Sequence, residues 1–354
     1  MSRTPLNAFC ALTMGQSPDS ESYNIEHNGF PFYQGNADFG RIHPMVRVWC
    51  SAPKKLAKAG DILISVRAPI GALNIADCDC CIGRGLAAIT PDATCADTMF
   101  LFYALYASAA ELQRRGTGST FKAISKNALS NLLLPSYCLK EQKEISAVLQ
   151  QVDHLISLRQ RQAEKLDELV KARFVEMFGD PVLNTRRLPS VSGTSLFKLS
   201  NGKAVPAEKR FDSGIPAYGG NGISWYTDEA LINTDTLVVG RVGFQSGNVH
   251  FVYGPLWITD NAMYVTWYRK ELICLRFLNQ LMKRVDFSRY QDAGDLKKIT
   301  QKPFMKFEYI LPSMNLQMEF VNFMDSVNCE KERIQRSAAL LETLKRSLMQ
   351  QYFG

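Results

Sequence analysis

Two loops of the sequence combine glycine, small hydroxyl side chains and several cations, a composition that suits phosphate oxygens. The first loop, residues 114–126, carries the cations Arg114, Arg115, Lys122 and Lys126. The second loop, residues 294–302, offers Gly294, Lys297, Lys298 and Lys302. Backbone amides freed by glycine, hydroxyl groups and Lys or Arg are the donors that hold a nucleic-acid backbone. A solvated turn explains either loop equally well when it is taken alone, but the recurrence in both halves of the chain favours phosphate binding.

Other loops carry side chains that can hydrogen-bond to the edges of bases. They are Tyr33, Gln34, Asn36, Arg41 and Arg47 in the first half, and Tyr218, Asn221, Trp225 and Tyr226 in the second. In the major groove Asn and Gln pair with adenine, and Arg pairs with guanine. Each residue taken singly is explained equally well as packing within its loop. Arg67 and Arg241 each end an apolar run, where the partner of the guanidinium is either a phosphate or an internal carboxylate.

The sequence motifs of enzymes are missing. Residues 83–88 fit the dinucleotide pattern G-x-G-x-x-A, but a strand and a turn follow where that motif requires a helix. There is no P-loop, no Gly-x-Ser-x-Gly elbow, no His-Glu-x-x-His helix and no Asp/Asn-Pro-Pro-Tyr/Phe tetrapeptide. Cys78 and Cys81 form one Cys-x-x-Cys, whereas zinc needs a second pair of ligands at suitable spacing. We therefore expect no catalytic residue and no metal site in this chain.

The elements that position these loops occur twice. Tyr33-Gln34-Gly35-Asn36 is matched by Tyr218-Gly219-Gly220-Asn221, and the apolar run that ends at Arg67 is matched by the run that ends at Arg241. Leu-Leu-Pro at 133–135 corresponds to Ile-Leu-Pro at 310–312, and Phe-Gly closes residues 178–179 and 353–354. The matched points lie 174 to 185 residues apart. A repeated sequence implies a repeated structural unit, here one large enough to be a domain followed by a helix.

A long amphipathic helix is predicted at the end of each half. Apolar residues recur at helical spacing from Leu139 to Met177, and Ile334, Leu341 and Leu348 lie seven residues apart with Ala338 and Leu344 between them. Seven-residue spacing is typical of a coiled-coil seam. Such helices are not stable alone in water, so we expect the two to pair antiparallel; a helical hairpin inside one domain is the alternative. A shorter helix is predicted at 97–113, a strand at 81–89 and another helix near 271–286.

The composition is that of a globular protein. The chain has 354 residues, enough for two domains, and a net charge of +7, which is compatible with a polyanionic partner. No apolar stretch is long enough for a transmembrane helix, and the start of the chain lacks the features of a signal peptide. Nine cysteines without a framework of spacings indicate free thiols in a reducing cytoplasm.

The chain resembles the specificity (S) subunits of type I restriction–modification systems. In the first half the resemblance lies in residues 14–18, 31–35, 60–71 and 82–85, and in the second half in residues 215–222, 239–243 and 257–262. The helical segments 139–179 and 316–354 are similar to the central and C-terminal spacer regions of the family. The order of these segments along the chain, and their duplication in the two halves, make the match specific. The segment that precedes Gly15 is short, which predicts a first domain without an N-terminal strand or helix segment.

The resemblance implies an α+β fold with two similar α/β target recognition domains, separated by two long antiparallel coiled-coil helices in a pseudo-twofold internal repeat. The expected boundaries are 1–136 for the first target recognition domain, 137–179 for the central spacer helix, 180–312 for the second target recognition domain and 313–354 for the C-terminal spacer helix. Below, residues 1–136 are called the first head and residues 180–312 the second head.

The resemblance also implies a non-catalytic, cytoplasmic DNA-recognition subunit. Each head would read one half of a bipartite site in double-stranded DNA, and the helices would set the gap and dock two modification (methyltransferase) subunits. S-adenosylmethionine, ATP and Mg²⁺ are then expected in partner subunits, which include restriction (translocase/endonuclease) subunits, and no cofactor is expected in this chain. The alternatives are a standalone DNA methyltransferase or nuclease with cryptic motifs, and a two-headed coiled-coil adaptor.

Base-contacting residues differ between members of the family, so the candidate residues rest on their chemistry. For DNA contact we expect Gln34, Asn36, Arg67, Arg84, Arg115, Lys122, Lys126, Tyr218, Asn221, Arg241, Lys297 and Lys298. For the paired helices and their partners we expect Val152, Leu166, Leu341 and Leu348.

Overall fold

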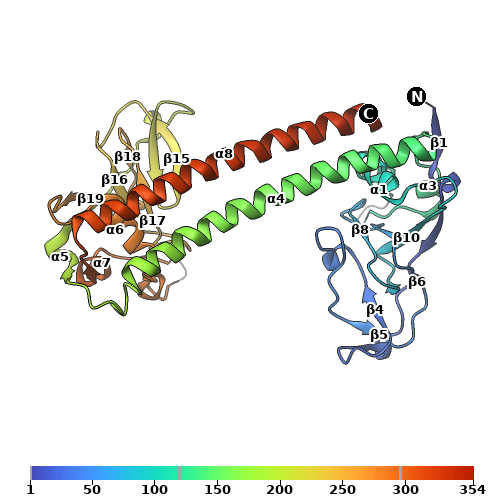
Figure 1. Ribbon diagram of the computed structural model, residues 1–354, viewed down its shortest axis with the longest axis horizontal. Helices are drawn as coiled ribbons and strands as arrows, with labels where there is room; N and C mark the ends of the chain where they lie inside the picture. Colours follow the sequence, from blue (N-terminus) through green and yellow to red (C-terminus); the bar gives the residue numbers. More distant parts are fainter. Residues whose placement is uncertain (1, 118–121, 295–296) are drawn as a thin grey trace. The chain divides into compact units, whose positions relative to one another are not determined.

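The computed structural model describes residues 2–117, 122–294 and 297–354 (Figure 1). The chain forms two compact units, one made of Met1–Gln160 with Gln335–Gly354 and the other of Arg161–Ile334. Each unit therefore contains one head and a part of each long helix. The four domain boundaries expected from the sequence remain predictions. In the described part of the chain, no helix is apolar over the length needed to cross a membrane.

The first head holds a four-stranded antiparallel sheet with strand order β2-β10-β7-β8 and a smaller sheet with order β3-β5-β4-β9-β6. Its helices are α1 (Thr98–Ala107), α2 (Ala109–Arg115) and α3 (Lys126–Ser130). Its strands are β1 (Arg3–Pro5), β2 (Cys10–Met14), β3 (Tyr23–Asn24), β4 (Phe30–Tyr33), β5 (Trp49–Cys50), β6 (Leu56–Ala57), β7 (Ile62–Ser65), β8 (Leu73–Ile75), β9 (Cys80–Ile82), β10 (Leu86–Pro91) and β11 (Leu133–Pro135).

Strand β7 shows why this head needs an uninterrupted apolar run. Ile62 and Ile64 pack in one hydrophobic cluster with side chains of α1, and Leu63 packs in another with Tyr33 and Ile82 of the smaller sheet. Alternate side chains of a strand point to opposite faces. Because both faces of the four-stranded sheet are covered, every residue of β7 is buried. Its one polar residue, Ser65, donates its hydroxyl to the carbonyl of Arg67 at 2.8 Å, since a buried hydroxyl without a partner would be costly.

The second head repeats this plan, with sheets of order β13-β19-β16-β17 and β15-β14-β18. Leu237 and Val239 of β16 pack with α6, and Val238 packs with Ile258 of the smaller sheet. The expected fold class is therefore confirmed. The elements are β12 (Ser190–Ser192), α5 (Gly193–Leu196), β13 (Phe197–Asn201), β14 (Ile215–Gly219), β15 (Gly222–Thr227), β16 (Thr236–Gly240), β17 (Val249–Val252), β18 (Trp257–Ile258), β19 (Ala262–Tyr268), α6 (Leu275–Met282), α7 (Lys302–Lys306) and β20 (Glu308–Ile310).

The repeat extends to the first residues described. In the first unit β1 pairs antiparallel with β11, and in the second unit β12 pairs with β20 in the same way. The expectation that the first head lacks an N-terminal strand is therefore wrong. Arg3–Pro5 is that strand, and it is three residues long, which is too short for a period-2 pattern to identify.

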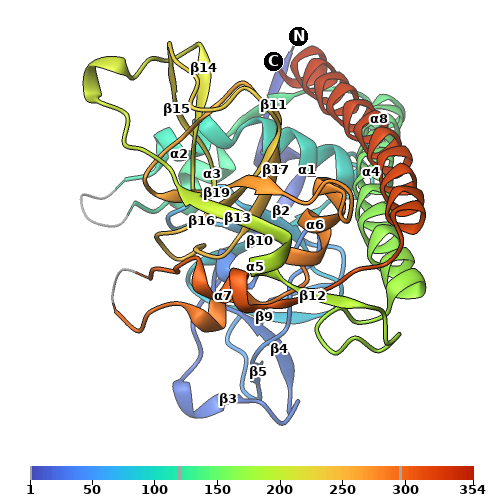
Figure 2. The same cartoon turned by 90° about the vertical axis from the view of Figure 1, so that its left-hand side faces the viewer.

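The long helices are α4 (Leu139–Phe178) and α8 (Met314–Phe353), each of 40 residues. They pair antiparallel within each unit: Lys345 binds Asp153 at 2.6 Å in the first unit, and Lys331 binds Asp167 at 2.6 Å in the second. Figures 1 and 2 show the two helices side by side. Val152 and Ile334 are buried, and Leu166, Leu341 and Leu348 are half-buried. Leu344, expected in the seam, is instead 46% exposed.

Three shorter elements differ from the sequence predictions. The helix expected at 97–113 is divided into α1 and α2 at Ser108, whose hydroxyl donates to the carbonyl of Ala104. The strand expected at 81–89 is two strands, β9 and β10, which belong to different sheets and are joined by the turn 83–85. The helix expected near 271–286 is shorter, because α6 covers only Leu275–Met282.

Candidate nucleic-acid interface

Each head contains a site where the end of one strand of the smaller sheet meets a turn between the two sheets. In the first head the carbonyl of Tyr33, which ends β4, accepts a hydrogen bond from the Gly83 amide at 2.8 Å. In the second head the carbonyl of Tyr218 on β14 accepts one from the Thr259 amide at 2.9 Å. The turns 83–85 and 259–261 are therefore equivalent. We call the two places the first and second edge sites.

The first edge site gathers four of the predicted DNA-contacting residues: Gln34, Asn36, Arg67 and Arg84. Gly85 allows the turn to lie close to the end of β4, because a Cβ at this position would be only 2.3 Å from the carbonyl oxygen of Gln34. The Gly85 carbonyl in turn accepts from the Val66 amide, which brings the end of β7 to the same place. The side chains of Gln34, Arg67 and Arg84 are exposed, and Asn36 is half-buried.

The second edge site contains an open cavity of about 300 Å³. Three carboxamide side chains line it, Asn221, Gln245 and Asn261, together with Gly219, Gly220, Ser224 and Val242. Gly220 lets the end of β14 lie close to the neighbouring backbone, because a Cβ there would be 3.1 Å from the Cα of Gly240 and 3.2 Å from the carbonyl oxygen of Asn261. A carboxamide offers a donor and an acceptor side by side, the pattern that pairs with the N6 and N7 of adenine.

Gln245 and Asn261 were not found from the sequence. They come from two different loops, and only the fold brings them to Asn221. The same loop as Gln245 carries Phe244, whose side chain is 90% exposed. An exposed aromatic ring next in sequence to a residue that lines a polar cavity fits packing against a sugar or a thymine methyl group.

The match between Arg67 and Arg241 made from the sequence is wrong by one residue. The Ile124 amide donates to the carbonyl of Val66, and the Ile299 amide donates to the carbonyl of Arg241. Arg241 is therefore equivalent to Val66, and Arg67 to Val242. Arg241 is half-buried, and its guanidinium donates to the carbonyl of Asp260 at 3.1 Å, so it holds the turn 259–261 in place.

Several other candidates make contacts within their own unit. Arg47 pairs with Asp38 at 2.8 Å, and Arg41 donates to the hydroxyl of Ser157 on α4. Tyr33 is fully buried, and burial raises the pKa of its phenol well above the ordinary value. The indole of Trp225 lies 4.3 Å from the guanidinium of Arg210. These contacts explain the four residues as packing residues, the alternative that the sequence left open.

The two basic loops are also equivalent. The Thr117 amide donates to the carbonyl of Ala123, and the Asp292 amide donates to the carbonyl of Lys298, both at 2.9 Å. Lys122 therefore corresponds to Lys297. Lys122, Lys126 and Lys298 are exposed, and Lys297 is half-buried. Residues 118–121 of the first predicted phosphate loop and residues 295–296 of the second lie outside the described residues.

Arg115 differs from the other cations of its loop. Its guanidinium binds Glu111 at 2.5 Å and donates to the carbonyls of Ala128 and Asn131 at 3.2 and 3.0 Å. These bonds join α2 to the end of α3. A guanidinium with three protein acceptors has little left for a phosphate, so the contacts argue against the predicted role of Arg115 in DNA binding.

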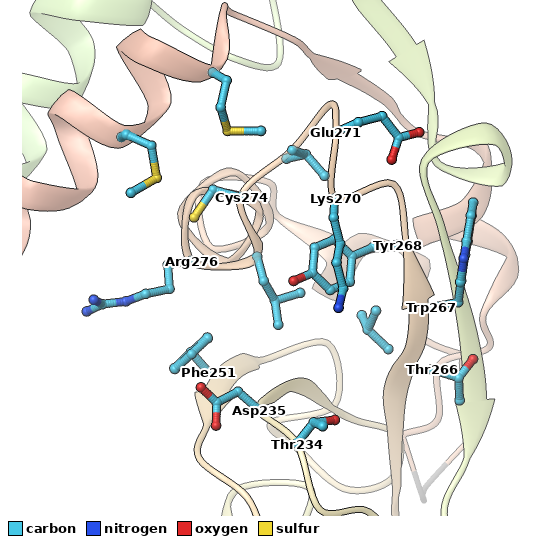
Figure 3. Close-up of a pocket in the computed structure, with 15 residues that line it drawn as sticks. Thr234, Asp235, Phe251, Thr266, Trp267, Tyr268, Lys270, Glu271, Cys274 and Arg276 are labelled. Carbon is cyan, nitrogen blue, oxygen red and sulfur yellow. The ribbon is translucent and has the colours of Figure 1, made fainter.

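A larger cavity lies elsewhere in the second unit, beside β19 and α6, and measures about 1070 Å³ (Figure 3). No histidine lines it. Its charged groups are engaged in other contacts: Arg276 pairs with Asp325, and the Lys270 ammonium lies 5.9 Å from the ring of Tyr268. Within residues 2–117, 122–294 and 297–354, no group of three or more His, Cys, Asp or Glu side chains is arranged to hold a metal ion.

Comparison with known proteins points to one family. Residues 6–168 match the family described as type I restriction modification DNA specificity domain. A putative type I restriction enzyme MjaX specificity subunit from Methanocaldococcus jannaschii is 42% identical over 163 residues, which are 46% of this chain and 38% of that protein. The type I restriction enzyme EcoprrI specificity subunit from Escherichia coli is 24% identical over 348 residues, covering 91% of this chain and 86% of that protein.

A solved structure shares the whole architecture. The type I restriction–modification S subunit from M. genitalium superimposes with a TM-score of 0.68 and covers 100% of this chain and 96% of that chain, at 16% sequence identity. At that identity the likeness concerns the fold. The chain spans less than two fifths of the length of the Methanocaldococcus relative, and most of the length of the Escherichia relative.

Proposed function

Because this chain belongs to the specificity subunits of type I restriction–modification systems, we propose that it recognises a two-part sequence in double-stranded DNA. Each head reads one half of the target through its edge site. The basic loops at 114–126 and 294–302 hold the phosphate backbone through their exposed lysines. In this proposal the chain itself performs no catalysis.

The observation that carries the proposal is that one backbone framework presents two different sets of side chains. The strand end and the turn are held by the same hydrogen bonds in both heads. Gln34, Arg67 and Arg84 stand at the first edge site, while Asn221, Gln245 and Asn261 stand at the second. A reader of an asymmetric target needs this combination, because a constant frame positions the reader and variable side chains read the bases.

Helices α4 and α8 continue from one unit into the other. We therefore propose that these helices set the distance between the two half-sites of the target. The exposed apolar side chains Val148, Leu155 and Leu169 of α4 follow one another at intervals of seven or fourteen residues. Exposed apolar residues at heptad spacing fit a partner helix or a partner surface. We propose two modification subunits as the partners there, with restriction subunits joining them.

The chemistry of the assembly belongs to these partners. S-adenosylmethionine would supply the methyl group in the modification subunits, and ATP with Mg²⁺ would serve the restriction subunits. The cysteines are free thiols, which fits a reducing cytoplasm as the proposed location. The comparisons support neither a standalone enzyme nor an adaptor for protein or glycan ligands.

Co-expression tests the function directly. We expect a host that makes this chain together with a type I modification subunit to methylate one split sequence, detected by methylome sequencing. The chain without the modification subunit should add no methylation. Methylation by this chain alone would support the enzyme alternative, and no retention of duplex DNA in a gel shift, with or without the modification subunit, would support the adaptor.

A further inference from the structure

A second cavity in the second unit gathers positive charge. It measures about 640 Å³ and is lined by residues of α6, β17 and the two long helices. The lining includes Lys171 of α4, His250 of β17, and Lys283 and Arg284, which directly follow α6. We call it the cationic cavity.

Most of the positive charge in the cationic cavity has no carboxylate partner. Asp167, a carboxylate of the lining, binds Lys331 at 2.6 Å, and the lining residue Arg276 pairs with Asp325. In the part of the chain that the structure describes, three cations of the lining form no ion pair: Lys171, Lys283 and Arg284.

These cations lie in surroundings that disfavour their charge. Burial lowers the pKa of the Arg284 guanidinium to about 10. Lys283 is exposed as a whole residue, but desolvation of its ammonium and the charge of Arg284 lower its pKa. Arg284 donates to the backbone carbonyl and the side-chain oxygen of Gln280 at 2.8 and 2.9 Å, and it lies 3.7 Å from the ring of Phe174. An anion bound here would offset both the desolvation and the repulsion between the cations.

Two polar atoms of the lining also lack a partner. The side-chain oxygen of Asn279 and Nε2 of His250 are buried, and neither is hydrogen-bonded to any residue that the structure describes. Asn279 is only 6% exposed. A buried polar atom without a partner costs free energy, so these atoms mark a site that a bound group completes.

The first unit has a carboxylate where the cationic cavity has a carboxamide. The side-chain nitrogens of Gln142 and Gln317 each donate to the carbonyl of the residue five positions earlier. By this register Asp153 of α4 corresponds to Asn328 of α8, which lines the cavity. Asp153 binds Lys345 at 2.6 Å. The first unit therefore neutralises its cation internally, whereas the second unit gathers cations around a neutral side chain.

We infer that the cationic cavity binds a small phosphate-bearing anion, with Lys171, Lys283 and Arg284 as its cationic donors. The inference goes beyond the proposed function and does not depend on it. Arginine binds phosphate oxygens through parallel N–H groups, and lysine binds them as a point charge. The volume is in the range of small-ligand sites. Because Arg284 is half-buried, a small anion reaches its guanidinium more readily than a duplex does.

The bound anion joins two parts of the second unit. Lys171 belongs to α4, whereas Lys283 and Arg284 follow α6 of the second head. A phosphate group held by all three therefore ties the second head to the long helices within this unit. Because the anion binds the folded chain, it should also raise the melting temperature.

Isothermal titration calorimetry of the full chain with inorganic phosphate, at constant ionic strength, tests the inference. We expect saturable binding with one site per chain. Lys283→Gln and Arg284→Gln each remove a charged donor, so the dissociation constant should rise roughly 10-fold or more. Lys306→Gln is the matched control, because Lys306 is an exposed lysine of the same head that does not line the cavity. It should leave the affinity unchanged.

Asn328→Asp gives the cavity the carboxylate that the first unit has, so phosphate binding should be lost. The absence of saturable heat with the parent chain would overturn the inference, as would equal affinities of Lys283→Gln and Lys306→Gln. Displacement of bound phosphate by duplex DNA would also overturn it, because the cavity would then hold the DNA backbone. These measurements need neither target DNA nor the modification subunit, so their failure leaves the proposed function intact.

Discussion

Gln142 and Gln317 occupy the same place in the two units and make the same three hydrogen bonds. The side-chain oxygen of Gln142 accepts from the Asp97 amide, and its nitrogen donates to the carbonyls of Cys95 and Tyr137. Gln317 accepts from the Cys274 amide and donates to the carbonyls of Leu272 and Pro312. Asp97 and Cys274 are the residues that precede α1 and α6. Each glutamine therefore ties the first turn of a long helix to the start of a head helix.

Replacing either glutamine should loosen the head that it serves. Both side chains are fully buried, so Gln142→Ala leaves one amide and two carbonyls without partners, at a cost of about 1–3 kcal/mol for each buried group left unsatisfied. We expect a lower free energy of unfolding in denaturant titration, with faster amide exchange at Asp97. Gln150→Ala, an exposed glutamine of the same helix, is the control. Equal unfolding curves for the two variants would show that the three bonds contribute nothing.

The exposed lysines of the basic loops should act on every DNA sequence alike. Lys122→Ala or Lys298→Ala removes one phosphate contact, so affinity should fall by a similar factor for target and non-target duplexes. The slope of log K against log salt should shrink by about one unit. Fluorescence anisotropy at several salt concentrations measures both effects. An unchanged slope in both variants would mean that these loops do not touch the backbone.

Arg115→Ala should behave differently from the lysine variants. This arginine joins α2 to α3 through three protein acceptors, so its loss should lower the stability of the first head by about 1–3 kcal/mol. The salt dependence of DNA binding should not change. Thermal unfolding combined with the same anisotropy series separates the two roles. A reduced salt slope with unchanged stability would restore Arg115 as a phosphate contact.

The carboxamide cavity of the second head should determine part of one half-site. Gln245→Ala or Asn261→Ala removes hydrogen bonds to a base edge, and discrimination at one position should fall by about 1–3 kcal/mol. Phe244→Ala should weaken binding without changing stability, because the ring is exposed in the free protein. Competition assays with single-base variants of the target measure both. Unaltered base preference in both amide variants would exclude the cavity from recognition.

The length of the helix pair should set the gap between the half-sites. Seven residues inserted after Ala163 and seven after Ala338 preserve the heptad seam and lengthen each helix by roughly 10 Å. The methylated motif should then keep its two half-sites and gain about three base pairs between them. Insertion into α4 alone is the control and should disrupt the pairing. Recovery of the original gap with both insertions in place would refute the spacing role.

The large features of the fold could be predicted from the sequence alone. The repeat, the two long helices and the α+β class followed from matched segments and from apolar spacing, because both signals depend on residues close together in the chain. Tyr33 and Tyr218, placed in equivalent positions by their flanking residues, are equivalent in the structure as well: each carbonyl receives the amide of the following turn.

The candidate site was predictable only in part. Arg67 and Arg241 looked equivalent because each ends an apolar run, but the register is decided by hydrogen bonds from Ile124 and Ile299, far away in sequence. Gln245 carries no local signal, and Asn261 lies in a segment that carries the family resemblance (257–262) without a sign that it meets Asn221; only the fold brings the three together. Arg115 looked like its neighbouring cations, although two of its three acceptors, the carbonyls of Ala128 and Asn131, belong to α3 and its end.

The return of α8 to the first unit also affects the order in which the protein can be completed. The ring of Phe353, at the end of α8, packs 5.4 Å from Phe100 in the first unit, and the hydroxyl of Tyr137 donates to the carbonyl of Tyr352. The head that leaves the ribosome first thus lacks part of its core until translation has reached Phe353. A premature stop codon that removes this last turn would harm the earliest-made head and spare the later one.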